Sequence, residues 1–232
     1  MVNKEENNFR TDSKILTTRL REDLDVWPNT TFALIISHCE DKTYMDEGII
    51  IGSNLALTFA KHIYRSDKEN KYPNKVEVGV SWDGVVEHDK SEVTKFLVPE
   101  EYVDSSNPKR EDYDFSVLLL AKSFEERNGY LGLSSVIQPE VFDYYVYAFI
   151  NGEKKSEVVK LQTIKVVEGS IVYTLATPHK PIVGSVLYYM DKNRKSYLVA
   201  IPTHSDEENH YAYYLNDKRL DKIEELIKKV QE

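Results

Sequence analysis

The chain has 232 residues, a formal net charge of -9 at pH 7, 41% hydrophobic residues and 11% aromatic residues. This apolar content is enough to bury a core, so the composition excludes a wholly disordered chain. The acidic charge disfavours a nucleic-acid partner, because phosphate neutralisation needs a basic surface. The single cysteine, Cys39, excludes an intramolecular disulfide and is expected to be a small buried residue.

Residues 1–27 form a polar segment that we interpret as an N-terminal arm. Residues 1–10 lack the apolar centre of a signal peptide. No segment of the sequence is long and apolar enough to span a bilayer, so we expect no membrane association. Secretion with a signal already removed is favoured over a cytoplasmic location.

From Phe32 onwards, short apolar runs separated by turn residues predict β-strands. Turns are expected at Asp83–Gly84, Asn151–Gly152 and Glu168–Gly169. The predicted strands are Phe32–Ser37, Gly48–Gly52, Leu55–Thr58, Val76–Trp82, Phe115–Leu120, Tyr144–Ile150, Val158–Val167, Ile171–Leu175, Gly184–Met190 and Tyr197–Ile201, with strand pattern also between Val85 and Val98. Many short strands with almost no helical periodicity favour an all-β sandwich or barrel.

The C-terminal segment has a different period. Apolar residues recur there every three or four positions, which predicts an amphipathic helix over about 217–231. They are Leu220, Ile223, Leu226, Ile227 and Val230. Asn216 or Asp217 is the expected cap. The apolar stripe predicts a helix docked on the body of the protein, and a partner-binding helix is the alternative.

Six segments, taken in chain order, resemble the chymotrypsin-fold serine proteases and in particular their glutamyl endopeptidase branch. They are Gly48–Tyr64, Asp112–Leu119, Gly129–Leu133, Val146–Lys154, Tyr173–Leu187 and Tyr197–Ile201. The resemblance implies two packed six-stranded antiparallel Greek-key β-barrels with a C-terminal helix, and we expect the apolar stripe of this helix to dock on the second barrel. It makes residues 28–232 one protease-like domain whose barrels meet near residues 105–130.

The same resemblance implies an altered catalytic triad. Without gaps, the position of the catalytic histidine holds Lys61, and His62 comes one residue later. A one-residue bulge would bring His62 into place. Asp114 matches the carboxylate that orients the histidine, although an aspartate before a buried strand can also simply bind turn amides.

The nucleophile position is occupied by Ile182, which has no nucleophilic atom. Lys180 replaces the glycine whose amide helps to form the oxyanion hole, and Pro181 lies between these two residues. Because proline restricts the residue before it, the amides of Lys180 and Ile182 are not expected to converge on one oxyanion.

The resemblance places Thr177, Pro202 and His204 at the specificity pocket. A bulky His204 is expected to narrow the pocket entrance. Residues 206–210 contain Asp206 and His210 and, together with His204, suggest a metal site. We favour a solvated charged loop and expect neither metal nor cofactor.

These features predict a catalytically inactive protease homologue that binds a protein or peptide as a decoy, regulator or scaffold. We expect a monomer or a weak oligomer. One alternative is an active hydrolase with a rearranged site of His62 and Asp114 with Ser185 or Cys39. Another is a purely structural subunit, which a large exposed apolar patch would indicate.

Overall fold

The computed structural model describes residues 9–10, 31–40, 42–80, 89–124, 129–150, 155–175, 182–193, 195–206 and 208–232. Only the backbone is described for the strand residues 9–10, 148–150, 155–157 and 182–185. The chain divides into two compact units. One holds residues 22–132 and 217–232, and the other holds residues 1–21 and 133–216. The turns expected at Asp83–Gly84 and Asn151–Gly152 lie outside the described residues.

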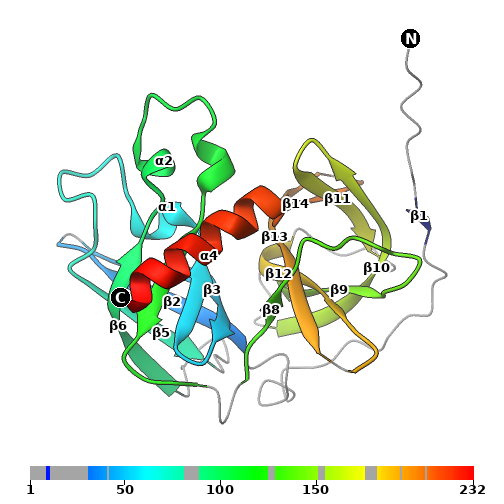
Figure 1. The fold of residues 1–232 in the computed structure, drawn as a ribbon, viewed down its shortest axis with the longest axis horizontal. Coiled ribbons are helices and arrows are strands. Elements are labelled where there is room, and N and C mark those ends of the chain that lie inside the picture. The colour runs from blue at the N-terminus through cyan, green and yellow to red at the C-terminus, as the bar shows by residue number, and fades with distance from the viewer. Residues whose placement is uncertain are drawn as a thin grey trace. The chain divides into compact units, whose positions relative to one another are not determined.

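Six strands of the first unit close into an antiparallel barrel in the order β2-β3-β4-β7-β6-β5 (Figure 1). The strands are β2 (Phe32–His38), β3 (Thr43–Gly52), β4 (Leu55–Thr58), β5 (Lys75–Val80), β6 (Asp89–Leu97) and β7 (Ser116–Leu120). Short helices interrupt them, namely α1 (Ala60–Ile63), α2 (Glu100–Val103) and η3 (Arg110–Tyr113). Thus α1 follows β4 directly, and η3 ends just before β7.

Aliphatic side chains fill this first barrel. Ile35, Ile50 and Leu118 are among its fully buried members. The glycine at position 48 makes room for Ile35, because a Cβ there would lie 2.5 Å from Cδ1 of Ile35 and that side chain would have to shift. This close packing explains why β3 combines an apolar run with a residue that has weak strand propensity.

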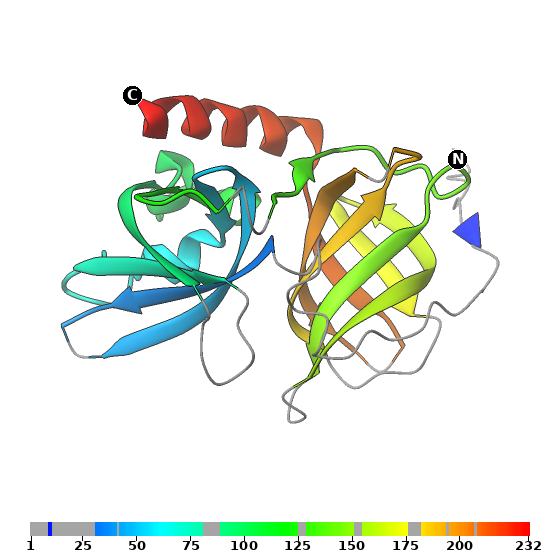
Figure 2. The ribbon, with the colours of Figure 1, turned by 90° about the horizontal axis from the view of Figure 1, so that it is seen from below.

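Six strands of the second unit also close into an antiparallel barrel (Figure 2), in the order β9-β10-β11-β14-β13-β12 with β12 paired to β9. They are β9 (Tyr144–Ile150), β10 (Lys155–Val167), β11 (Ser170–Leu175), β12 (Ile182–Met190), β13 (Ser196–Ser205) and β14 (His210–Tyr214). Two further strands of two residues each pair with strands of this barrel: β1 (Phe9–Arg10) with β10, and β8 (Gly132–Leu133) with β13.

The second barrel differs from the first in having a tyrosine-rich core. The ring of Tyr189 stacks on Phe142 and on Tyr197, with ring centroids 4.5 and 5.2 Å away. The buried hydroxyl of Tyr144 donates to the carbonyl of Val136 and accepts from the amide of Gln138. These hydrogen bonds satisfy the polar end of a ring that is otherwise buried.

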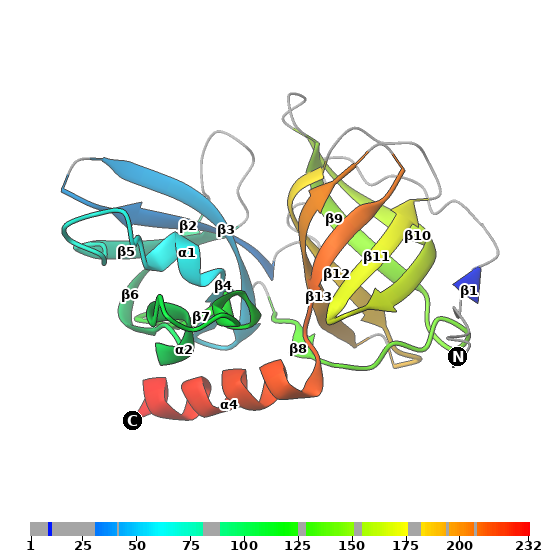
Figure 3. The ribbon, with the colours of Figure 1, turned by 90° about the horizontal axis from the view of Figure 1, so that it is seen from above.

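Helix α4 (Asp217–Gln231) packs on β6 and β7 of the first barrel, beside α2 (Figure 3). The expectation that it packs on the second barrel is therefore wrong. Polar contacts fix the helix to the first unit in addition to its apolar stripe. Arg219 binds Asp112 at 2.7 Å, and Lys222 binds Glu101 at 3.0 Å.

The predicted fold class is confirmed: two closed six-stranded antiparallel barrels and one C-terminal helix. The predicted turn at Glu168–Gly169 joins β10 to β11, and both residues have positive φ, 48° and 83°. Such angles at both central positions are those of a tight hairpin turn. Strand β14 was missed, because its charged approach, residues 206–210, suggested a loop.

Candidate functional site

Asp114 lies where η3 ends and β7 is about to begin, and its carboxylate faces α1 of the same barrel. The backbone N–H of Lys61 donates to Oδ1 of Asp114 at 3.0 Å. The ammonium of Lys61 lies 3.7 Å from Oδ2 and 4.4 Å from the centre of the Phe59 ring. The backbone N–H and the side-chain ammonium of Lys61 thus both contact the Asp114 carboxylate.

The Asp114 side chain is only 8% exposed, whereas that of Lys61 is 53% exposed. Burial raises the pKa of Asp114, while the amides of Lys61 and Ala60 and the charge of Lys61 act in the opposite direction. A buried carboxylate that orients an imidazole is the third member of a serine-protease triad. In this chain, the Asp114 carboxylate contacts the ammonium of Lys61 in α1 and not an imidazole.

His62 is the next residue of α1, but its ring points to other partners. Nδ1 lies 2.9 Å from the hydroxyl of Thr58, and Nε2 lies 3.6 Å from Oδ1 of Asp46. Burial, together with the charges of Lys61 and Arg65, lowers the pKa of His62 to about 3. The alternative catalytic set would require this ring to turn from Thr58 and Asp46 towards Asp114.

Sequence reasoning missed the residues that hold the His62 ring. Thr58 ends β4, Asp46 lies on β3, and Arg65 follows α1; Nη2 of Arg65 is 3.1 Å from Oδ2 of Asp46. The available signal was the four-residue spacing from Thr58 to His62 across the strand-to-helix turn. Asp46 gave no local signal, because its contact depends on the pairing of β3 with β4.

The remaining catalytic positions are described only in part. Ile182 begins β12 opposite Ile150 of β9, and Ser185 lies opposite Ala148 in the same pair of strands. The register shifts between Val183 and Ser185. The side chains of Ile182 and Ser185, and residues Thr177, Lys180 and Pro181 as a whole, lie outside the described part of the structure.

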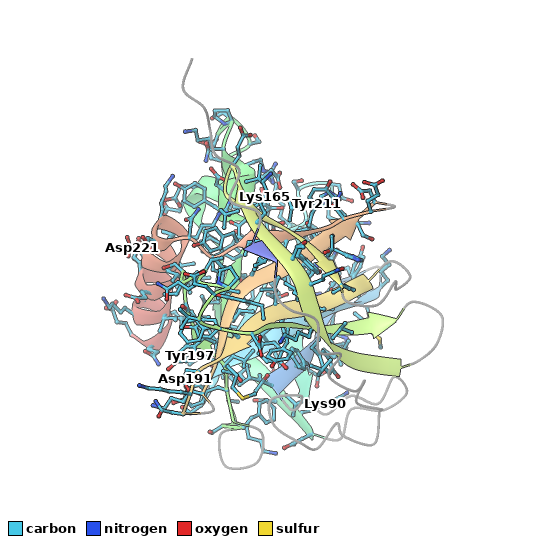
Figure 4. The ribbon with its side chains drawn as sticks, turned by 90° about the vertical axis from the view of Figure 1, so that its right-hand side faces the viewer. Lys90, Lys165, Asp191, Tyr197, Tyr211 and Asp221 are labelled. Atoms are coloured by element: carbon cyan, nitrogen blue, oxygen red, sulfur yellow. The ribbon has the colours of Figure 1, made fainter. Side chains whose placement is uncertain are left out.

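The two other residues that the sequence predicts at the specificity pocket lie on β13. Pro202 is buried opposite Ala212 of β14. His204 is exposed, and its ring stacks on Tyr211, labelled in Figure 4, with centroids 4.5 Å apart and planes within 5°. Its Nδ1 lies 3.0 Å from the hydroxyl of Thr203.

The acidic loop beside His204 is organised by Asp206. Oδ1 of Asp206 accepts from the amides of Glu208 and Asn209, and Oδ2 accepts from the Tyr211 hydroxyl. This carboxylate therefore stabilises the turn before β14. Within the described residues, no group of three His, Cys, Asp or Glu side chains is arranged to hold a metal ion.

Cys39 follows β2 and is a free, partly exposed thiol, so the expected full burial is wrong. Its backbone N–H donates to the carbonyl of Lys42 in the turn to β3. Among the described helices, none is both long and apolar enough to cross a bilayer.

Comparison with known proteins identifies the fold. No protein-family model matches the sequence. No curated protein sequence matches it either. Among solved structures, a Glu endopeptidase in complex with MPD has a TM-score of 0.63 at 16% identity, covering 97% of this chain and 98% of that one.

Two further proteases are similar over most of their length. The protease Anisep from Arthrobacter nicotinovorans has a TM-score of 0.60 at 10% identity, covering 87% of this chain and 93% of its own. The thermostable serine protease AL20 from an extremophilic microorganism has a TM-score of 0.58 at 8% identity, covering 83% and 94%. Together with the two closed barrels, these similarities show that the chain has the chymotrypsin-like serine protease fold.

Proposed function

We propose that the chain is a serine-protease homologue without peptidase activity that acts by binding a protein or peptide. The observation that carries this proposal is the contact between Lys61 and the buried Asp114. Peptide cleavage by this fold needs a base that removes the proton of the nucleophile. A lysine ammonium has no lone pair with which to accept that proton.

The environment of His62 supports the same conclusion. Its ring is buried between Thr58 and Asp46, and its pKa is lowered to about 3. A base with so low a pKa is weak at neutral pH, where efficient general bases have values near the working pH. If the His62 ring turned towards Asp114, into the place that Lys61 occupies, it would lose its contacts with both Thr58 and Asp46.

The nucleophile position adds support from the sequence. The resemblance aligns Ile182 with the catalytic serine and Lys180 with the oxyanion-hole glycine. Isoleucine has no oxygen or sulfur to attack a carbonyl. Loss of one oxyanion-hole donor alone lowers the rate by about a hundred- to a thousandfold.

Polypeptide binding is the part of protease function that such changes leave intact. The similar structures include an endopeptidase, whose name implies a polypeptide substrate. A protein or peptide ligand, recognised without cleavage by a monomer or weak oligomer, is therefore the partner we propose. Secretion fits the same role.

The test is a peptide-library assay on the purified full chain at neutral pH. We expect mass spectrometry to detect no cleavage, and a display selection to enrich peptides that bind reversibly in calorimetry. Cleavage that persists after repurification would contradict the proposal. If cleavage were lost in His62→Ala but not in Lys61→Ala, the rearranged site with His62 as base would replace it.

A further inference from the structure

The hydrogen bonds around His62 determine which ring nitrogen carries its proton. The hydroxyl of Thr58 donates to the carbonyl of Glu47 at 2.6 Å, so its only proton is already used. Nδ1 of His62, 2.9 Å from the same oxygen, must therefore act as the donor. In a neutral imidazole, this leaves Nε2 with a lone pair and no proton.

That lone pair faces a carboxylate. Nε2 lies 3.6 Å from Oδ1 of Asp46, which is longer than a hydrogen bond. Two acceptors that face each other in a buried site attract only when a proton lies between them. One proton at this place would turn an unfavourable contact into a charge-assisted hydrogen bond.

The charged groups around the ring come from two elements. Strand β3 contributes the Asp46 carboxylate and the backbone of Glu47, which hydrogen-bonds to His62, and α1 with the residues after it contributes Lys61 and Arg65. Strands β2 and β4 contribute only the neutral hydroxyls of Ser37, which donates to the His62 carbonyl, and Thr58. Arg65 spans the site, because Nη2 contacts Oδ2 of Asp46 and the His62 carbonyl.

We propose that Nε2 of His62 and Oδ1 of Asp46 form a binding site for a single proton, which is empty at neutral pH and fills on acidification. The proton comes from solvent, and no other bond is broken. The net charge of His62, Asp46 and Arg65 together rises from zero to plus one. Asp46 then interacts with two cations, so its contact with Arg65 weakens.

The electrostatic directions agree with an empty site at neutral pH. Burial lowers the pKa of His62 and raises that of Asp46, so both groups resist charge. Two such groups titrate as a pair, and the bound proton belongs to both. Lys61, whose charge helps to lower the pKa of His62, is also the residue that contacts Asp114. This inference depends on the geometry of the first barrel alone and not on the proposed function.

The test is nitrogen NMR of histidine side chains in the full chain, labelled at both ring nitrogens. At pH 7 we expect His62 to carry its proton on Nδ1. On acidification Nε2 should gain one proton, with a midpoint well below the ordinary value of 6.5. Protonation of Nε2 at pH 7, or global unfolding before Nε2 gains a proton, would overturn the proposal.

Two variants with opposite expected effects show whether Asp46 is the partner. Asp46→Asn removes the anion, so the His62 midpoint should move to lower pH. Arg65→Gln removes the competing cation, so the midpoint should move to higher pH. A His62 midpoint that is unchanged in whichever variant folds would contradict the proton site.

Discussion

Lys61 and His62 are adjacent in α1 but occupy opposite environments. The Lys61 side chain is 53% exposed and pairs with Asp114, whereas the His62 side chain is 10% exposed and lies between Thr58 and Asp46. Consecutive residues of a helix point in different directions. Shifting the alignment with the protease family by one residue therefore moves the position of the catalytic histidine from one of these environments to the other. In this chain the ammonium, and not the imidazole, contacts the buried carboxylate.

The two environments differ in what they contribute to stability. The ammonium of Lys61 is exposed, so its contact with Asp114 is worth at most about 1 kcal/mol, because water screens its charge and holding its side chain costs entropy. A buried polar group that loses its partner costs about 1–3 kcal/mol. We therefore expect substitutions around His62 to have larger effects than substitutions at Lys61.

The largest effect is expected for Thr58→Val. The Thr58 hydroxyl accepts from Nδ1 of His62 and donates to the Glu47 carbonyl, so the change removes two hydrogen bonds at once. The free energy of unfolding should fall by about 3 kcal/mol in urea denaturation. Thr94→Val is the matched control, because the exposed Thr94 hydroxyl makes one hydrogen bond, to Leu119. If Thr58→Val lowered the free energy of unfolding no more than Thr94→Val does, the expected difference between the two sites would be refuted.

The next effect concerns pH. The pKa of His62 is about 3 in the folded state against an ordinary 6.5, so between these values only the unfolded chain binds this proton. Falling pH therefore favours unfolding. From pH 8 to pH 5, this one group should remove about 2 kcal/mol of stability.

Comparison with His62→Gln isolates the effect, because the carboxylates with raised pKa values are present in both proteins. The variant should lose less stability over this pH range than the wild type. Parallel curves for wild type and His62→Gln would show that the ring is not buried in its neutral form.

Smaller effects are expected on the exposed side of α1. Lys61→Met should change stability by less than about 1 kcal/mol. Asp114→Ala should cost about 2 kcal/mol, because the Lys61 amide loses its acceptor, and Asp114→Asn should cost less because the amide oxygen keeps accepting. Thermal denaturation of the three variants measures this order. Equal losses at Lys61 and Asp114 would mean that the ion pair, and not the backbone contact, is what stabilises the site.

The strands were largely predictable because they have strong local signals, whereas the two six-stranded barrels were predicted from the resemblance to a protease family. The run Phe32–Ser37 became β2, and the two positive φ angles at Glu168 and Gly169 match the predicted turn. The docking of α4 was not predictable, because it depends on pairs such as Arg219 with Asp112 that are 107 residues apart. Strand β14 was hidden for a similar reason, since its pairing with β11 and β13 is long-range.

The candidate site was predictable only where the residues themselves limit the chemistry. Asp114 before a buried strand and the choice between Lys61 and His62 were visible in the sequence. The direction of the His62 ring was not, because it depends on Asp46 of β3 and Arg65 after α1. Strand pairing and a salt bridge bring these residues together, and neither follows from local pattern.

Repair of the catalytic positions should restore at most weak activity. Ile182→Ser alone should be inactive, because Lys61 still contacts Asp114. Adding Lys61→His, Lys180→Gly and Pro181→Asp should give slow turnover of activated esters. Residues of one catalytic unit act non-additively, so the gain should appear only in the combined variant. Ester hydrolysis by the single and the combined variant measures this. Robust peptide cleavage by Ile182→Ser alone would mean that the base and the oxyanion hole are intact.

The most direct test of the central claim is reaction of the wild-type chain with an active-site-directed fluorophosphonate, followed by intact-mass measurement. This reagent modifies a serine only when a neighbouring base and an oxyanion hole activate it. Because Lys61 lies beside Asp114, and because we propose that Ile182 occupies the nucleophile position, we predict an unchanged mass. A stoichiometric adduct on any serine, lost in His62→Ala, would contradict the account.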